Sequence, residues 1–194
     1  MAAADAPGHG EREGRGVTLA AVESLRLAAT ASDLLFREAH CLDSRQWDEW
    51  LALYTEQCEF WVPAWKSEDV PTADPNAELS LIYYPSRAGL EERVWRVKSG
   101  RSIASRPLPR TQHQVTNVRV IDARPPLGSG EPNEMRVAYQ WCVNQFAHKI
   151  AEVQVFFGHA EADLVHQDGA WRFARKKILL LNDYIPTKLD FYNV

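Results

Sequence analysis

Two residues on one predicted strand have the types and spacing of metal ligands. His159 and Glu161 are separated by one residue, so both side chains project to the same face of a strand. A histidine and a carboxylate are part of a two-histidine, one-carboxylate iron site, and the remaining ligand would come from His113 or His148. However, Asp163 continues this polar face, and apolar residues alternate with it along the strand. We therefore favour an ordinary strand with one wet side over a metal site.

His113 raises a second possibility, which is general acid–base catalysis. It stands among polar neighbours in the segment RTQHQVTNVRV, and a carboxylate beside it inside a cone-shaped sheet would allow it to act as a base. A single histidine in a polar strand more often serves as a hydrogen-bonding partner within the structure or at an interface. We favour this structural role and keep the base as the alternative.

The sequence lacks the local motifs of most cofactor chemistry. It contains no Cys-x-His pair of a Rieske cluster, no Cys-x-x-Cys pair, no HExxH, no nucleotide-binding GxGxxG or GxxxxGK[ST], and no GxSxG. Its 3 cysteines, Cys41, Cys58 and Cys142, are far apart, and an odd number is a poor disulfide framework. We expect reduced thiols, and no catalytic, cofactor-binding or metal-binding residue in this chain.

Composition and charge narrow the class of protein. The 194 residues carry a formal net charge of −4, which argues against binding to nucleic acid or an anionic membrane, since both need a basic surface. No segment reaches the roughly 18 apolar residues of a membrane span, and the start of the chain lacks the apolar core of a secretion signal. We expect a cytoplasmic protein. One local basic run is expected to solvate an exposed strand face or to pair with a partner's acidic groups: Arg172, Arg175, Lys176 and Lys177.

The first part of the chain has helical spacing. Residues 18–41 contain no glycine or proline and favour Ala, Leu, Glu and Arg, which predicts a helix. Asp43 and Ser44 provide an N-cap for a second helix that extends to Tyr54. One face of this second helix is apolar and is expected to pack inward: Trp47, Trp50, Leu51 and Tyr54.

Strand-like alternation replaces this helical spacing further along the chain. Cys58, Phe60 and Val62 share one face of a predicted strand, after which residues 67–78 form a polar loop. The segment LSLIYY predicts a short strand and residues 86–100 a helix, followed by a loop to residue 110. From residue 111 onward, long alternating segments are joined by turns such as Asp168-Gly169, which predicts an antiparallel meander.

This order of elements predicts the fold class. Helices first and one long curved sheet afterwards are typical of an α+β domain. We expect residues 1–17 to form a flexible leader, because they are rich in Gly, Ala and charge. Residues 18–194 are expected to form a single α+β domain.

Three stretches carry a resemblance to a known family: FREAHCLDSRQWDEWLALYTEQCEFWVPAW, LSLIYYPSRAGLEERVWRVKSGRSIASRPLPRTQHQVTNV and KKILLLNDYIPTKLDFY. In these stretches the chain resembles the beta (small) subunit of aromatic-ring-hydroxylating dioxygenases, especially the branch acting on benzoate, toluate, anthranilate and related ring carboxylates. The resemblance covers roughly residues 32–194. The leader and the Pro-Gly turn near residues 125–132 are peculiar to this chain.

The resemblance implies a fold similar to nuclear transport factor 2, a cone in which N-terminal helices pack in a strongly curved, mainly antiparallel sheet. It also implies a larger alpha subunit as the partner, with three copies of each chain. In such enzymes the Rieske 2Fe-2S cluster and the mononuclear non-heme iron lie in the alpha subunit, and NADH supplies electrons through a reductase. No catalytic residue of the family carries over onto this chain.

These observations favour a structural subunit that assembles with and stabilises the catalytic subunit of a dioxygenase. Trp61 and Trp65 are expected to face a neighbouring chain or cap the sheet, and further subunit contacts are expected from Arg110, His113 and Arg119. Two alternatives stay open. One is a free-standing isomerase or dehydratase on the same fold that uses His113, and the other is a binding protein for an aromatic acid.

Overall fold

A single curved sheet with helices on its concave side makes up the described part of the chain. The computed structural model describes residues 10–101, 107–125, 130–185 and 188–194, with side chains from residue 21 onward. Within these residues six strands form one sheet in the order β2-β1-β6-β5-β4-β3. The elements are α1 (Gly10–Asp43), α2 (Trp47–Ala52), β1 (Tyr54–Pro63), β2 (Ser80–Tyr84), α3 (Arg87–Lys98), β3 (Arg110–Arg124), β4 (Glu134–Ala147), β5 (Glu152–Gln167), β6 (Ala170–Leu180) and η2 (Phe191–Asn193).

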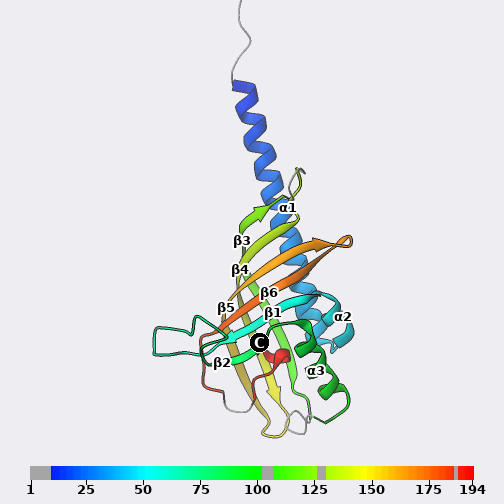
Figure 1. Ribbon diagram of the computed structural model, residues 1–194, viewed down its shortest axis with the longest axis vertical. Coiled ribbons are helices and arrows are strands. Elements are labelled where there is room, and N and C mark those ends of the chain that lie inside the picture. Colours follow the sequence, from blue (N-terminus) through cyan, green and yellow to red (C-terminus); the bar gives the residue numbers. More distant parts are fainter. Residues whose placement is uncertain (1–9, 102–106, 126–129, 186–187) are drawn as a thin grey trace, which may run out of the picture.

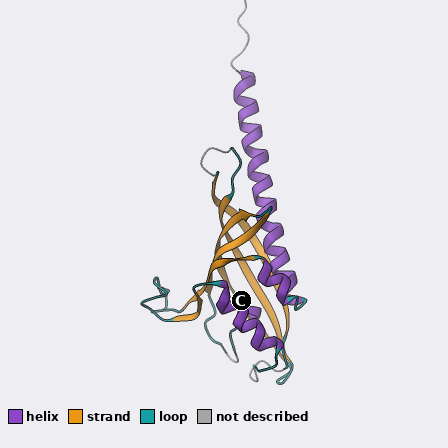
Figure 2. Cartoon of the chain, turned by 45° about the vertical axis from the view of Figure 1, so that its right-hand side comes forward, coloured by secondary structure: helices purple, strands orange, loops and turns teal. Residues whose placement is uncertain are grey.

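Strand pairing follows the predicted antiparallel meander with one exception. β3, β4, β5 and β6 pair with their neighbours in antiparallel fashion, as do β1 and β2. The exception is the parallel pairing of β1 with β6, which joins the first strand to the last. The sheet curves around α1, and α2 and α3 lie at its wide end (Figures 1 and 2). The predicted α+β class with a curved, mainly antiparallel sheet is confirmed.

Helix α1 is longer than its sequence pattern predicted. It begins at Gly10 rather than near residue 18, and its N-terminal part projects beyond the sheet (Figure 1). The chain has no proline between Pro7 and Pro63, so no proline interrupts the hydrogen-bond ladder of this helix. Of the predicted leader, residues 1–9 lie outside the described residues and residues 10–17 are helical. No helix among the described residues has the length and apolar character that crossing a membrane requires.

The second helix is shorter than predicted, and its predicted cap was wrong. It begins at Trp47 after Gln46, without a side-chain cap, and ends at Ala52, so Tyr54 starts strand β1 instead. Asp43 belongs to the last turn of α1, and its carboxylate binds strand β3 rather than capping α2. The predicted inward face is largely confirmed, because Trp47, Trp50 and Tyr54 are buried and Leu51 is half-buried against the core.

Alternation along the strands separates a buried inner face from an exposed outer face. On β5, Ala160, Ala162 and Leu164 are buried, whereas His159 and Glu161, which alternate with them, are exposed. The turn into β6 contains Asp168 and Gly169, both with positive φ (52° and 76°), as a two-residue hairpin turn requires. The turn chemistry predicted at this position is confirmed.

Aromatic rings fill the wide end of the cone. The rings of Trp50 and Phe191 are stacked with centroids 4.8 Å apart, and those of Tyr54 and Phe173 are stacked at 4.9 Å. Phe191 comes from the C-terminal segment, which therefore closes the end of the core that α2 and α3 border.

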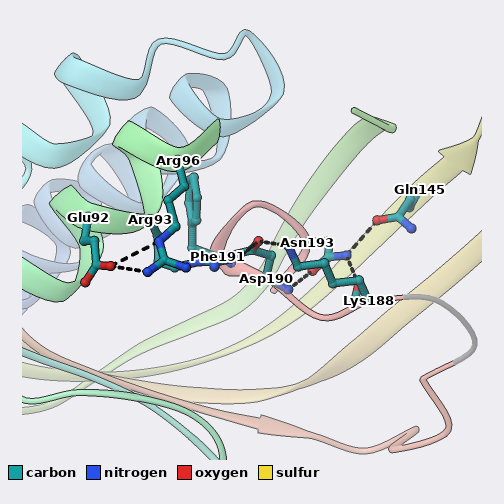
Figure 3. A network of polar contacts seen from close by, with 8 residues as sticks. All are labelled: Glu92, Arg93, Arg96, Gln145, Lys188, Asp190, Phe191 and Asn193. Atoms are coloured by element: carbon teal, nitrogen blue, oxygen red, sulfur yellow. Dashed lines mark hydrogen bonds and ion pairs between the residues drawn. The ribbon is translucent and has the colours of Figure 1, made fainter. Parts of the chain in front are cut away.

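Polar contacts hold this C-terminal segment in place (Figure 3). Asp190 is buried and accepts hydrogen bonds from Arg93 of α3 and from the backbone N–H of Phe191. Asn193 donates through Nδ2 to the side chain of Gln145 and to the backbone carbonyl of Lys188, at 2.8 Å in each case. The segment is thus tied to both α3 and β4.

Candidate functional site

A buried ion pair lies inside the cone between α1 and β6. Glu38 and Lys176 are 3% and 5% exposed, and Lys176 Nζ donates to Glu38 Oε1 at 2.6 Å. The hydroxyl of Tyr54 donates to the same carboxylate oxygen. Burial, followed by the charge of Glu38, raises the pKa of Tyr54 well above its ordinary value, so this hydroxyl stays protonated as a donor. The aromatic rings of Phe60 and Phe173 lie 5.8 and 5.9 Å from the ammonium group.

His113 and Asp43 form a second polar pair in the cone. His113 Nδ1 lies 2.6 Å from Asp43 Oδ1, and the backbone N–H of His113 donates to Asp43 Oδ2 at 2.9 Å. The hydroxyl of Thr111 donates to Oδ1 at 3.0 Å. These contacts join the C-terminal end of α1 to β3, and they supply the carboxylate that the sequence left unidentified as the partner of His113.

The electrostatics of this pair favour an ionised carboxylate. Burial raises the pKa of Asp43, but the hydrogen bonds and charge of His113, together with the Thr111 hydrogen bond, outweigh that effect and leave the pKa below its ordinary value of 3.8. An ionised carboxylate only accepts hydrogen bonds, so Nδ1 of His113 carries the hydrogen that it donates to Asp43. In neutral His113, Nε2 is then an acceptor.

A small cavity lies between these two pairs. Its volume is about 20 Å³. Glu38, Lys176 and His113 line it together with residues of α1, of strands β3, β4 and β6, and of the C-terminus: Ala39, Leu42, Gln114, Val115, Tyr139, Trp141, Ile178 and Val194. The arrangement of a histidine, a carboxylate and a buried ion pair could transfer protons, but the space could not admit an aromatic ring, since ligand pockets measure roughly 300–1,000 Å³.

The structure does not bring the predicted metal ligands together. His159 pairs across the sheet with Gln140 on the exposed face, whereas His113 pairs with Val143, which is fully buried. Because directly opposite residues share a face, His159 and His113 lie on opposite faces of the sheet. His148 follows the end of β4 with its ring against Phe146. In the described part of the chain no group of at least three His, Cys, Asp or Glu residues could hold a metal ion.

The carboxylate face of β5 is occupied by ion pairs instead. Asp163 Oδ1 accepts from Arg136 Nε at 2.6 Å, and Asp163 Oδ2 lies 3.8 Å from Arg175 Nη1. Arg175 in turn donates to Glu59 at 2.9 Å. These contacts tie four neighbouring strands together on the outer face.

The three cysteines are free thiols, as predicted. Cys41 and Cys58 are buried and Cys142 is partly exposed. Burial raises the pKa of the Cys58 thiol to about 12, and it also raises the pKa of Cys41 and Cys142. Raised pKa values keep these groups protonated and poorly nucleophilic.

The basic run on β6 was only partly interpreted correctly. Lys176 is buried and paired within the chain, so the prediction of an exposed position was wrong for it. Lys176, Ile178 and Leu180 share the inner face by period-2 alternation. This alternation is present in the sequence and could have shown that the side chain of Lys176 points inward. Lys177 points outward, and its ammonium lies 4.6 Å from the centre of the Trp61 ring.

Of the predicted contact residues, some are not available to a partner chain. Trp61 is 2% exposed, because Lys177 covers its ring and its Nε1 donates to Ser80 at 2.8 Å. His113 likewise has a buried side chain, 7% exposed. Trp65 is partly exposed, with its Nε1 donating to the carbonyl of Leu180. Two predicted contact residues are exposed on β3: Arg110 and Arg119.

Comparison with known sequences gives matches over most of the chain. A family model described as "Ring hydroxylating beta subunit" matches residues 37–187. The benzoate 1,2-dioxygenase subunit beta of Acinetobacter baylyi is 37% identical over 163 residues, which cover 84% of this chain and 91% of that protein. The toluate 1,2-dioxygenase subunit beta of Pseudomonas putida is 36% identical over 162 residues, covering 84% and 94%.

Solved structures agree with these matches. The crystal structure of the benzoate 1,2-dioxygenase beta subunit of Burkholderia mallei has a TM-score of 0.66 at 32% identity, covering 86% of this chain and 96% of that one. A hexachlorocyclohexane dehydrochlorinase shares the fold with a TM-score of 0.56 at 14% identity, covering 87% and 93%. The predicted cone, with helices packed in a curved sheet, is confirmed by these likenesses.

Proposed function

Because the chain belongs to the family of ring-hydroxylating beta subunits, we propose that it is the small subunit of a dioxygenase that dihydroxylates aromatic carboxylates. The observation that carries this proposal is the 37% identity to the benzoate dioxygenase subunit over nearly its whole length. Relatives named for benzoate, toluate and anthranilate share a ring that bears a carboxylate. The complete enzyme would add both atoms of O₂ to such a ring, with electrons from NADH delivered through a reductase.

The catalytic groups belong to the partner in this proposal. A Rieske cluster needs two cysteines and two histidines in close pairs, and none of the three cysteines has a histidine two residues after it. Among the described residues, no group of three or more His, Cys, Asp or Glu residues could hold a metal ion. The donor set of this chain thus does not fit the cluster or the mononuclear iron. We assign both to the alpha subunit and no catalytic, cofactor-binding or metal-binding role to any residue here.

An exposed apolar row supports a role in assembly. Val153, Val155 and Phe157 follow one another on the outer face of β5 and are 65%, 41% and 43% exposed. Contiguous apolar surface of this kind is typical of protein contact sites. We propose that this row packs against the alpha subunit in a cytoplasmic complex of three alpha and three beta chains.

The His113–Asp43 pair favours one alternative, a free-standing isomerase or dehydratase. The same pair of residue types would act as a base and its orienting group. The cavity beside it measures about 20 Å³, however, which is too small for a ring substrate or an aromatic acid. The structural subunit is therefore the function that the chain's geometry supports better.

Co-expression with a candidate alpha subunit tests the assembly. We expect both chains to purify together and benzoate-dependent O₂ uptake to require both of them. Turnover of any small substrate by the isolated chain, abolished by His113→Ala, would instead establish the free-standing enzyme.

Two variants locate the contact. Phe157→Asp places a charge within the apolar row and should reduce co-purification, whereas His159→Asp places the same charge two residues further on the same face and should not. Unchanged co-purification of Phe157→Asp would overturn the contact surface alone. Failure of the unmodified chain to co-purify would overturn the assembly itself.

A further inference from the structure

Three buried hydrogen-bonding atoms around the small cavity have no protein partner among the described residues. They are Nε2 of His113, the hydroxyl of Tyr139 and Nε1 of Trp141. All three residues line the cavity of about 20 Å³. Trp50 Nε1 also lacks a partner, but Trp50 does not line this cavity. Buried polar groups in folded proteins are nearly always paired, so three such atoms around one cavity indicate that a small molecule is bound there.

Sheet register places these side chains on the same inner face. Tyr139 and Trp141 are two residues apart on β4, and Trp141 pairs with Val115 of β3. Val115 is two residues from His113, so all these side chains point into the cone. The three polar atoms thus approach the cavity from two adjacent strands, with the ion pair of Glu38 and Lys176 on a further side.

The three atoms form a complementary set of donors and acceptors. In neutral His113, Asp43 holds the single ring hydrogen on Nδ1, so Nε2 offers a lone pair. The indole N–H of Trp141 can only donate, and the hydroxyl of Tyr139 can do either. Burial, with the charge of Glu38, raises the pKa of Tyr139 well above its ordinary value, so this hydroxyl keeps its hydrogen. A neutral group that both accepts and donates satisfies all three atoms.

Charge and size exclude the other simple occupants. A cation would face the indole N–H of Trp141 and the ammonium of Lys176, and an anion would face the carboxylate of Glu38. The cavity of about 20 Å³ exceeds the roughly 10–15 Å³ that one water needs, but it leaves no room for a larger solute.

We propose that this cavity binds one internal water molecule, which donates to His113 Nε2, accepts from Trp141 Nε1 and bonds to the Tyr139 hydroxyl. The water extends the contacts of Asp43 through His113 to β4, and so connects the end of α1 with two strands of the sheet. This site is independent of the proposed assembly, since all of its residues belong to this chain.

A crystal structure of the full chain, at a resolution that shows ordered waters, tests the site directly. We expect a single oxygen-sized peak within hydrogen-bonding distance, roughly 2.7–3.2 Å, of all three atoms. A cavity without density, density for a larger molecule, or a peak that contacts fewer than two of the atoms would overturn the proposal.

Oxygen-17 magnetic relaxation dispersion in solution provides a second test, because it detects long-lived internal waters. Tyr139→Phe removes one of the three hydrogen bonds and should shorten the residence time of the water about tenfold. Tyr84→Phe is the matched control, because Tyr84 lies on β2 and does not line the cavity. An equal change in both variants, or none in Tyr139→Phe, would show that the relaxation arises elsewhere and would contradict the site.

Discussion

The ammonium of Lys176 lies 2.6 Å from the carboxylate of Glu38, although 138 residues separate them in the sequence. Both side chains are buried, so neither charge is compensated by solvent. The contact joins the first helix to the last strand inside the cone. The pair stabilises the fold because each charge compensates the other; either partner alone would be a buried, unpaired charge.

Removal of Lys176 should therefore be costly. Lys176→Met leaves Glu38 without its counter-charge and is expected to lower the free energy of unfolding by about 3–5 kcal/mol, measured by urea denaturation. The double variant Glu38→Gln with Lys176→Met should recover most of this loss, because the amide still accepts from Tyr54. Lys98→Met, which breaks the exposed pair with Asp48, should cost less than about 1 kcal/mol. Equal losses in the two single variants would contradict the role of burial.

Stability should depend on pH through Asp43. The pKa of Asp43 is lowered in the folded state. Its contribution to the free energy of unfolding is therefore fully present above the ordinary value of 3.8 and is lost as pH falls through the folded pKa. Asp43→Asn should cost about 1.5–3 kcal/mol at pH 7, and the difference from the unmodified chain should shrink below about pH 4. Denaturation curves between pH 2 and 7 measure this. Asp48→Asn, on an exposed carboxylate, should show little difference at any pH, and a pH-independent loss in Asp43→Asn would contradict the assignment.

The C-terminal segment should detach when its buried carboxylate is removed. Asp190→Ala deprives Arg93 of its partner and Phe191 of its backbone acceptor, and a loss of about 3 kcal/mol is expected. Hydrogen exchange should accelerate first in residues 188–194, because the rest of the sheet does not depend on this contact. Asp183→Ala, on an exposed carboxylate nearby, should leave exchange unchanged. Slow exchange of the segment in Asp190→Ala would show that packing of Phe191 alone holds it.

Gly158 should tolerate no side chain. A Cβ atom at this position of β5 would lie 1.8 Å from the backbone oxygen of Leu179, and a backbone atom held in the sheet cannot move aside easily. Gly158→Ala is expected to lower the free energy of unfolding by about 1–3 kcal/mol or more. Gly130→Ala, where nothing lies within 4 Å, should stay within about 0.5 kcal/mol of the unmodified chain.

The predicted leader can be tested by truncation. Removal of residues 1–17 should change the free energy of unfolding by less than about 0.5 kcal/mol, because this part precedes Leu27, the first buried residue of α1 among those whose side chains the structure describes. Removal of residues 1–30 also deletes Leu27, which is 8% exposed in the core, and should cost at least about 2 kcal/mol. A large loss in the shorter truncation would show that the domain begins before residue 18.

The sequence was a good guide where a local pattern determines the structure. Phe60 and Val62 are buried as their alternation predicted, and the Asp168-Gly169 turn requires the positive φ angles that its residue types favour. Contacts between segments that are distant in the sequence could not be predicted from a local pattern. No local pattern near Asp43 indicates a strand 70 residues away, and its carboxylate contacts His113 instead of capping the second helix. Trp61 is buried because Lys177 of β6 lies beside it. This contact depends on the parallel pairing of β1 with β6, which the alternation of residue types within one strand does not predict.

The parallel pairing of β1 with β6 has a consequence for how the chain folds during synthesis. β1 ends at Pro63, yet one of its two neighbours in the sheet is β6, which begins at Ala170. Until those later residues leave the ribosome, the hairpin of β1 and β2 and the meander of β3 to β5 are separate pieces with open edges. Closure of the cone is therefore a late, long-range event, and the nascent chain exposes strand edges that are prone to aggregation until β6 joins them.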